Sequence, residues 1–242
     1  MIGISIHWSS ILVFFALGLI GIWVAYSFLN KSGLYLFSIL LTTISFWMES
    51  ASVFSYPVGM IVVLVPLLFF ALLTCLNKFG MEEAKKLFYT ILISMASVFV
   101  FVFFEAAYLD SVIKSSLYLS WEFLSKYIVS IIAFALSALV TINIVKKIPT
   151  KKLKKFLVLS INIAIASAIF AIIYTVLVWS GLLSFGGILL TILISVVLCA
   201  LLSLCLGYIE KYMNREVVSN QKENEQENKP EEKEQKTPED ID

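Results

Sequence analysis

Residues 186–209 read GGILLTILISVVLCALLSLCLGYI and carry no charged side chain. At 1.5 Å per residue, a helix of this length spans about 36 Å, which exceeds the roughly 30 Å hydrocarbon core of a bilayer. Six other stretches approach the same length and apolar character: 8–29, 34–54, 58–76, 87–108, 122–145 and 155–179. The sequence therefore predicts an all-α integral membrane protein, a bundle of six or seven transmembrane helices.

The stretch 34–54 leaves the number of spans open. After Met48 it passes into ESASVFSYP, where small polar residues and Pro57 suit a helix end or a re-entrant piece. Seven spans result if this stretch crosses the membrane, and six if it does not.

The composition agrees with a membrane chain. Of the 242 residues, 60% are apolar and 14% charged, against roughly 45–50% apolar residues in an ordinary soluble domain. The first ten residues, MIGISIHWSS, contain no Lys or Arg and so lack the basic start of a signal peptide. We therefore expect the first apolar run to be a retained helix.

The lysines in the short loops predict the orientation. With seven spans, the loops on one side hold ten lysines and the opposite loops hold two, Lys114 and Lys126. The ten are Lys31, Lys78, Lys85, Lys86, Lys146, Lys147, Lys151, Lys152, Lys154 and Lys155. Since cytoplasmic loops collect basic residues, we expect a multi-pass protein of the cell membrane with its N-terminus outside and its C-terminus in the cytoplasm.

The end of the chain differs from the rest. From Glu216 onward it contains ten of the seventeen acidic residues and almost no apolar ones. Such a segment buries too little surface to fold, so we expect a polytopic transmembrane domain at 1–212 and a disordered acidic cytoplasmic tail at 213–242. The tail suits either a solubilising segment or a docking segment for a cytoplasmic protein.

Residues that carry enzymatic or metal chemistry are scarce. His7 is the one histidine, and the three cysteines, Cys75, Cys199 and Cys205, have no CxxC spacing. The pair Glu82–Glu83 is similar to the double glutamate of intramembrane CAAX-type proteases, but that chemistry also needs histidines within the membrane. We therefore expect no enzyme, metal site or cofactor, and no nucleic-acid partner.

One predicted loop and its flanking helix ends contain a pattern that resembles the motif of a known family. Residues 74–94, TCLNKFGMEEAKKLFYTILIS, place Phe79–Gly80 and then Ala84–Lys85–Lys86 at a helix junction. This resembles the queuosine-precursor transporter family, also called the vitamin-uptake-transporter-like family, over about residues 34–210. The resemblance implies a purine-like substrate, no ATPase of its own and the option of a homodimer. This chain departs from the family pattern at Leu73, Asn77 and Phe170, where the family has acidic residues.

Candidate ligand contacts lie at the predicted outer helix ends. Glu105 ends the run VFVFVFF at 98–104, and Glu49 follows Trp47 near the end of another stretch. Acids beside aromatic faces suit a cationic or planar ligand, which supports Glu49, Glu105 and Trp47 as substrate-binding residues. The alternative is that Glu105 is an interfacial acid that reaches headgroups or water, with lysines neutralising the acids.

Other positions suit packing or helix geometry. Pro66 lies near the middle of the third stretch, where the missing N–H permits a helix break. Asn143 and Asn162 suit hydrogen bonds between helices. The glycines Gly18, Gly21, Gly186 and Gly187 suit close helix approach.

Two functions follow from these observations. The first is a multi-pass transporter for a small molecule, either a 7-deazapurine or a similar planar or cationic solute. The alternative is a non-transporting membrane sensor or scaffold module that recruits a cytoplasmic partner through its tail. A polar core would favour transport, whereas a core packed solid with Phe and Leu would favour the scaffold.

Overall fold

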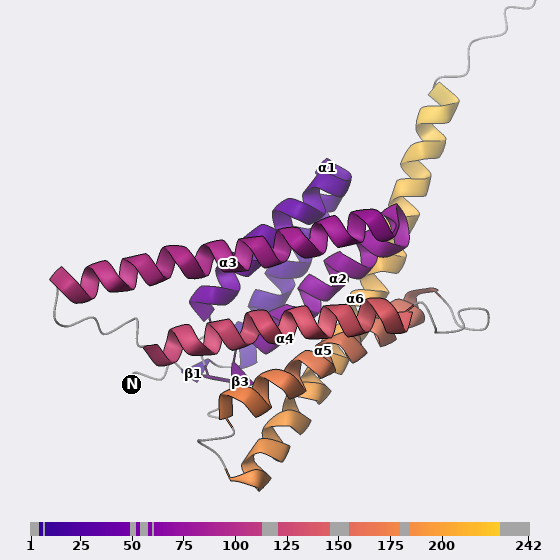
Figure 1. Cartoon of the computed structure of the whole chain (residues 1–242). Coiled ribbons are helices and arrows are strands. Elements are labelled where there is room, and N and C mark those ends of the chain that lie inside the picture. The colour runs from indigo at the N-terminus through magenta and orange to yellow at the C-terminus, as the bar shows by residue number, and fades with distance from the viewer. Residues whose placement is uncertain are drawn as a thin grey trace, which may run out of the picture.

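The computed structural model describes residues 5–6, 8–48, 52–53, 58–59, 61–112, 121–145, 155–179 and 184–227. These residues form six helices and a small three-stranded sheet (Figure 1). The helices are α1 (Trp8–Met48), α2 (Ile61–Phe79), α3 (Met81–Val112), α4 (Trp121–Val145), α5 (Lys155–Trp179) and α6 (Phe185–Glu227). The strands are β1 (Ser5–Ile6), β2 (Ser52–Val53) and β3 (Val58–Gly59).

Five helices are long and apolar enough to cross a membrane. The spans are Phe15–Ile44, Met81–Phe101, Leu124–Ile144, Phe156–Val178 and Phe185–Ile209, and α2 adds the shorter apolar segment Leu64–Phe79. Their outward side chains include Phe101, 69% exposed, and Leu193, 60% exposed, which suit contact with lipid. The predicted all-α, multi-pass membrane protein is confirmed.

Helix α1 folds back on itself at Asn30. A straight helix of 41 residues would be about 62 Å long. The strands on either side of α1 nevertheless pair, with Ser5 opposite Ser52. Asn30 has φ 50° and ψ −123°, outside the helical region, and asparagine tolerates such a conformation better than most residues. The helix therefore consists of two arms, 8–29 and 31–48, so the described residues form seven helical rods.

Small residues let the two arms approach closely. A Cβ atom added to Gly33 would overlap the backbone carbonyl oxygen of Ala25, and one added to Gly21 would lie 3.0 Å from Cε2 of Phe37. In both contacts, one residue comes before Asn30 and the other comes after it by a similar number of residues. The arms are therefore antiparallel, and Gly33 has no room for a side chain.

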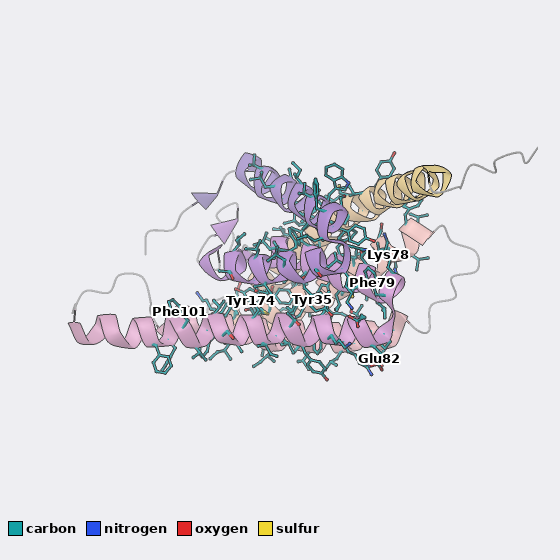
Figure 2. The ribbon with its side chains drawn as sticks, turned by 90° about the horizontal axis from the view of Figure 1, so that it is seen from above. Tyr35, Lys78, Phe79, Glu82, Phe101 and Tyr174 are labelled. Atoms are coloured by element: carbon teal, nitrogen blue, oxygen red, sulfur yellow. The ribbon has the colours of Figure 1, made fainter. Side chains whose placement is uncertain are left out.

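A second hairpin, α2 and α3, lies beside the first. Gly80 joins these helices with a positive φ of 89°, and its N–H donates to the carbonyl of Leu76 over 3.2 Å. Left-handed glycines are a common way to end a helix. We call the end of the bundle with Gly80 and Asn30 the corner end, and the end with β1–β3 the sheet end. Figure 2 shows Lys78, Phe79 and Glu82 at the corner end and Phe101 toward the other.

Helix α2 is the centre of the bundle. Every side chain from Leu64 to Cys75 is buried, and α2 packs against α1, α3, α5 and α6. A helix that is apolar on all sides belongs in such a position. Rings from three helices stack beside it, with the centroid of Phe134 lying 5.2 Å from that of Phe69 and 6.4 Å from that of Phe88.

Helices α5 and α6 pack closely along a ridge of small residues. Five buried residues of α6 are spaced four apart and so form one ridge inclined to the helix axis: Thr191, Ser195, Cys199, Ser203 and Gly207. A Cβ atom added to Gly207 would overlap the Ser160 side chain and lie 2.7 Å from the carbonyl oxygen of Phe156. Membrane helices commonly use such ridges for close packing.

The glycine predictions have a mixed outcome. Gly18 does sit at a close approach, since an added Cβ would lie 2.6 Å from Cδ1 of Leu67, and Gly21 does as well. Gly186 does not, because nothing lies within 4 Å of its added Cβ. The prediction of close packing at Gly186 is therefore wrong, and Gly207, which the sequence did not single out, has that role on α6.

Two boundaries also differ from the sequence-based ones. Residues 52–53 and 58–59, expected within spans, form strands β2 and β3 instead, in a segment of mostly small residues where each strand contains one valine, Val53 or Val58. Helix α6 continues to Glu227, past the tail boundary predicted at residue 213. No Gly or Pro lies between Gly207 and Pro230, and Glu, Gln and Lys have a high helix propensity, which lets an existing helix extend through them. Residues 228–242 lie outside the described residues.

Candidate functional site

The predicted ligand contacts fall partly outside the described residues. Trp47 lies in the last turn of α1 and Glu105 lies in α3, but the side chains of both are outside the described part, and so is the whole of Glu49. The second arm of α1 and α3 run in the same direction, because Tyr35 contacts Glu83 and Thr42 contacts Ser94. Trp47 and Glu105 therefore lie toward the sheet end of two neighbouring helices, and their role in ligand binding stays a prediction.

Pro66 lies in the second turn of α2. Its side chain is buried, and α2 continues through it to Phe79. A proline this close to the helix start removes one backbone hydrogen bond without ending the helix. Among the described helices, residues with non-helical backbone angles occur in α1, at Asn30, rather than beside Pro66.

A charged network joins the two hairpins at the corner end. Lys31 Nζ lies 2.6 Å from Oε2 of Glu83, and Lys86 Nζ lies 2.9 Å from Oε1. The Tyr35 hydroxyl lies 3.2 Å from both Oε2 and the backbone carbonyl oxygen of Glu83, and donates there. Glu83 thus connects the second arm of α1 to the start of α3.

A second contact joins the first arm of α1 to α2. Lys78 Nζ donates to the hydroxyl of Tyr26 over 2.9 Å and lies 4.4 Å from the centre of its ring. A cation so close to an aromatic ring gains from both interactions. The sequence analysis did not foresee the pairing of Glu83 with Lys31, although the lysines of the predicted loops on the same side were a signal for it.

Replacing Glu83 by Gln is expected to lower the melting temperature of the purified protein by a few degrees, because Lys31 and Lys86 would lose their shared counter-charge. Glu82→Gln is the matched control, since Glu82 is exposed and makes no ion pair among the described residues. High salt should shrink the difference between the wild type and Glu83→Gln. Equal melting temperatures for the two variants at low salt would contradict a stabilising role of the network.

The bundle core contains polar side chains of two kinds. One kind donates to a carbonyl of its own helix: Ser137 Oγ to Ala133, Thr141 Oγ1 to Ser137, and Ser203 Oγ to Cys199, over 2.6–2.7 Å. The other kind has a buried oxygen with no protein partner among the described residues: Ser38, Thr74, Asn162, Ser167 and Ser195. The first kind is satisfied internally, and the second requires an explanation.

Three of the unpartnered groups lie at a similar depth. Thr74 is five residues from the end of α2, Asn162 is seven from the start of α5, and Ser38 is eight beyond the Asn30 turn. The end of α2, the Asn30 turn and the start of α5 all lie at the corner end, the last as Figure 1 shows. At 1.5 Å per residue, the three side chains therefore lie about 8–12 Å from that end. Helices α2 and α5 pack against one another. We call Ser38, Thr74 and Asn162 the polar layer.

Asn162 has the greatest hydrogen-bonding capacity in the polar layer. It is 4% exposed, and its Oδ1 lacks a protein partner among the described residues. An amide offers two donor hydrogens and a carbonyl acceptor, whereas a hydroxyl offers one hydrogen. Asn143, by contrast, is exposed, and its Nδ2 donates to the carbonyl of Leu139 in its own helix over 2.9 Å. Asn143 therefore does not make the predicted bond between helices.

The buried polar set carries no charge. Its members among the described residues are serines, threonines and one asparagine. The described part of the chain contains no group of three or more His, Cys, Asp or Glu side chains placed to hold a metal ion. The chemistry this core offers is hydrogen bonding to an uncharged polar group.

The chain matches no protein-family model, no curated protein and no solved structure. None of these comparisons extends the resemblance of residues 74–94 to the queuosine-precursor transporter family. What the fold establishes is a multi-pass membrane protein with a corner-end ion-pair network and an uncharged polar layer in its core.

Proposed function

We propose that this chain transports a small polar molecule across the membrane. The observation that supports the proposal is the polar layer, above all Asn162, whose carbonyl oxygen is buried without a protein partner. A polar group deep in a membrane protein is costly unless it is hydrogen-bonded. Polar groups kept there commonly mark the route of a solute.

The solute class follows from the same groups. Hydroxyls and an amide recognise an uncharged partner that both donates and accepts hydrogen bonds. A neutral 7-deazapurine base has such an edge and a planar face, and the resemblance of residues 74–94 supports this class of substrate. Trp47 and Glu105, toward the sheet end of α1 and α3, are then proposed as the first contacts together with Glu49, and the polar layer as the deeper one.

Uptake measurements test the proposal. The purified protein in liposomes should accumulate labelled 7-deazaguanine above the level of empty liposomes, and excess unlabelled compound should compete. Adenine and uracil, offered separately, define how strictly the purine-like shape is selected. A correctly folded protein that accumulates none of these compounds would exclude transport of planar bases.

A second function is supported by a different observation. The side chains of α2 are packed solid from Leu64 to Cys75, and α6 extends past the bundle as a helix to Glu227 (Figure 1). These features suit a scaffold that recruits a cytoplasmic protein through its C-terminal segment. Proximity labelling in cells, comparing the full chain with one ending at residue 212, tests it: neighbours lost on truncation support recruitment, and identical neighbours exclude it.

A further inference from the structure

The corner end carries more positive than negative charge. Its described residues include four lysines and two glutamates: Lys31, Lys78, Lys85, Lys86, Glu82 and Glu83. These six side chains carry a net charge of +2. These residues lie where the apolar spans of α2 and α3 meet at Gly80, at a helix end, and therefore at the depth of lipid headgroups.

Glu83 holds two of these lysines close together. Lys31 and Lys86 contact the two oxygens of one carboxylate, over 2.6 Å and 2.9 Å. One carboxylate cannot neutralise two ammonium groups, and each ammonium has three donors. The side chains of Lys31 and Lys86 are 45% and 65% exposed, so both have donors free to face a further anion.

Lys78 adds a third cation. Its Nζ contacts the hydroxyl and ring of Tyr26, and no carboxylate among the described residues lies within ion-pair distance of it. The Tyr26 contact fixes the ammonium near the turn of α1 without removing its charge. The corner end thus presents pre-positioned cations from α1, α2 and α3.

Exposed apolar side chains lie next to these cations. Phe28, three residues before Lys31, is 83% exposed, and Leu29, two residues before it, is 50% exposed. A soluble anion would pair with the lysines and leave these side chains uncovered. A phospholipid covers both, because its acyl chain lies against apolar side chains while its phosphate meets the cations.

We infer that the corner end binds an anionic phospholipid, with the headgroup phosphate between Lys31 and Lys86 and an acyl chain beside Phe28. Basic pockets between membrane helices recognise anionic headgroups in this way. The site is independent of transport, since it uses none of the residues of the polar layer.

Native mass spectrometry of the detergent-purified full chain tests this inference. Dioleoyl-phosphatidylglycerol is titrated in, with dioleoyl-phosphatidylcholine as the neutral lipid and inorganic phosphate as the soluble anion. The variant is the double change Lys31→Gln and Lys86→Gln, and Lys126→Gln on α4 is the matched control for loss of a lysine elsewhere. A further variant with Lys31→Arg and Lys86→Arg keeps both positive charges.

The wild type, Lys126→Gln and the double Arg variant should bind phosphatidylglycerol alike. The double Gln variant should bind roughly 25-fold more weakly, because each lysine near an anionic headgroup contributes about fivefold in affinity. Equal binding by the double Gln variant would overturn the inference, and so would equal binding of phosphatidylcholine. If the double Gln variant fails to fold, the wild type decides the question. Inorganic phosphate that prevents the binding of phosphatidylglycerol would overturn a lipid-specific site. Binding that persists in the presence of inorganic phosphate but is lost at high salt would support one.

Discussion

Asn162→Leu is expected to reduce uptake by about fivefold or more while leaving the protein as stable as the wild type or more stable. Leucine nearly matches asparagine in shape but cannot hydrogen-bond. Because Oδ1 of Asn162 is buried without a protein partner among the described residues, an apolar replacement removes a desolvated oxygen without breaking a hydrogen bond to it. A solute that pairs with the amide would lose about 1–3 kcal/mol of binding.

The opposite directions of the two effects make the test specific. Asn143→Leu is the matched control, since Asn143 is exposed on α4 and its amide bonds its own helix. We expect this control to change uptake little. Melting temperature and uptake are measured on the same preparations. A stable Asn162→Leu protein with normal uptake would show that Asn162 lies off the solute route and would remove the main support for transport.

Gly33→Ala is expected to destabilise the protein by several kcal/mol or to prevent its accumulation. The added Cβ would overlap the carbonyl oxygen of Ala25, a backbone atom that cannot move without separating the two arms of α1. Helix propensity alone would predict that Gly33→Ala stabilises the protein, because alanine is favoured over glycine by about 1 kcal/mol in a helix interior.

Gly186→Ala is the control for this change. Gly186 lies near the start of α6, and nothing lies within 4 Å of its added Cβ, so alanine there should be neutral or slightly stabilising. Thermal unfolding in detergent and the yield from membranes are the measurements. If Gly33→Ala and Gly186→Ala behave alike, the close approach of the arms is not needed for the fold.

The rods of the fold were largely predictable because span length and apolar character are local properties. The stretches 8–29, 122–145 and 155–179 agree closely with helical segments, and the break before Lys31 was visible as a gap between two apolar runs. The strands at 52–53 and 58–59 were not foreseen, since strands of two residues exist through their partners rather than through their own pattern.

The candidate site was much less predictable. Acids in apolar surroundings, such as Glu105, are conspicuous in a sequence, whereas a buried Asn162 or Thr74 looks like any polar residue of a membrane helix. The missing partner of Asn162 depends on which helices pack around α5, and the pairing of Glu83 with Lys31 depends on the register between α1 and α3. Such facts arise only when segments distant in the chain meet.

The pairing of β1 with β2 also bears on how the chain enters a bilayer. It places Ser5–Ile6, ahead of α1, on the same membrane face as Ser52–Val53, which follow α1. If that face is the outer one, as the lysine distribution predicts, the amino-terminal residues must be carried across the bilayer during biogenesis. Residues 1–7, MIGISIH, contain no lysine or arginine, so their translocation moves no lysine or arginine charge through the hydrocarbon.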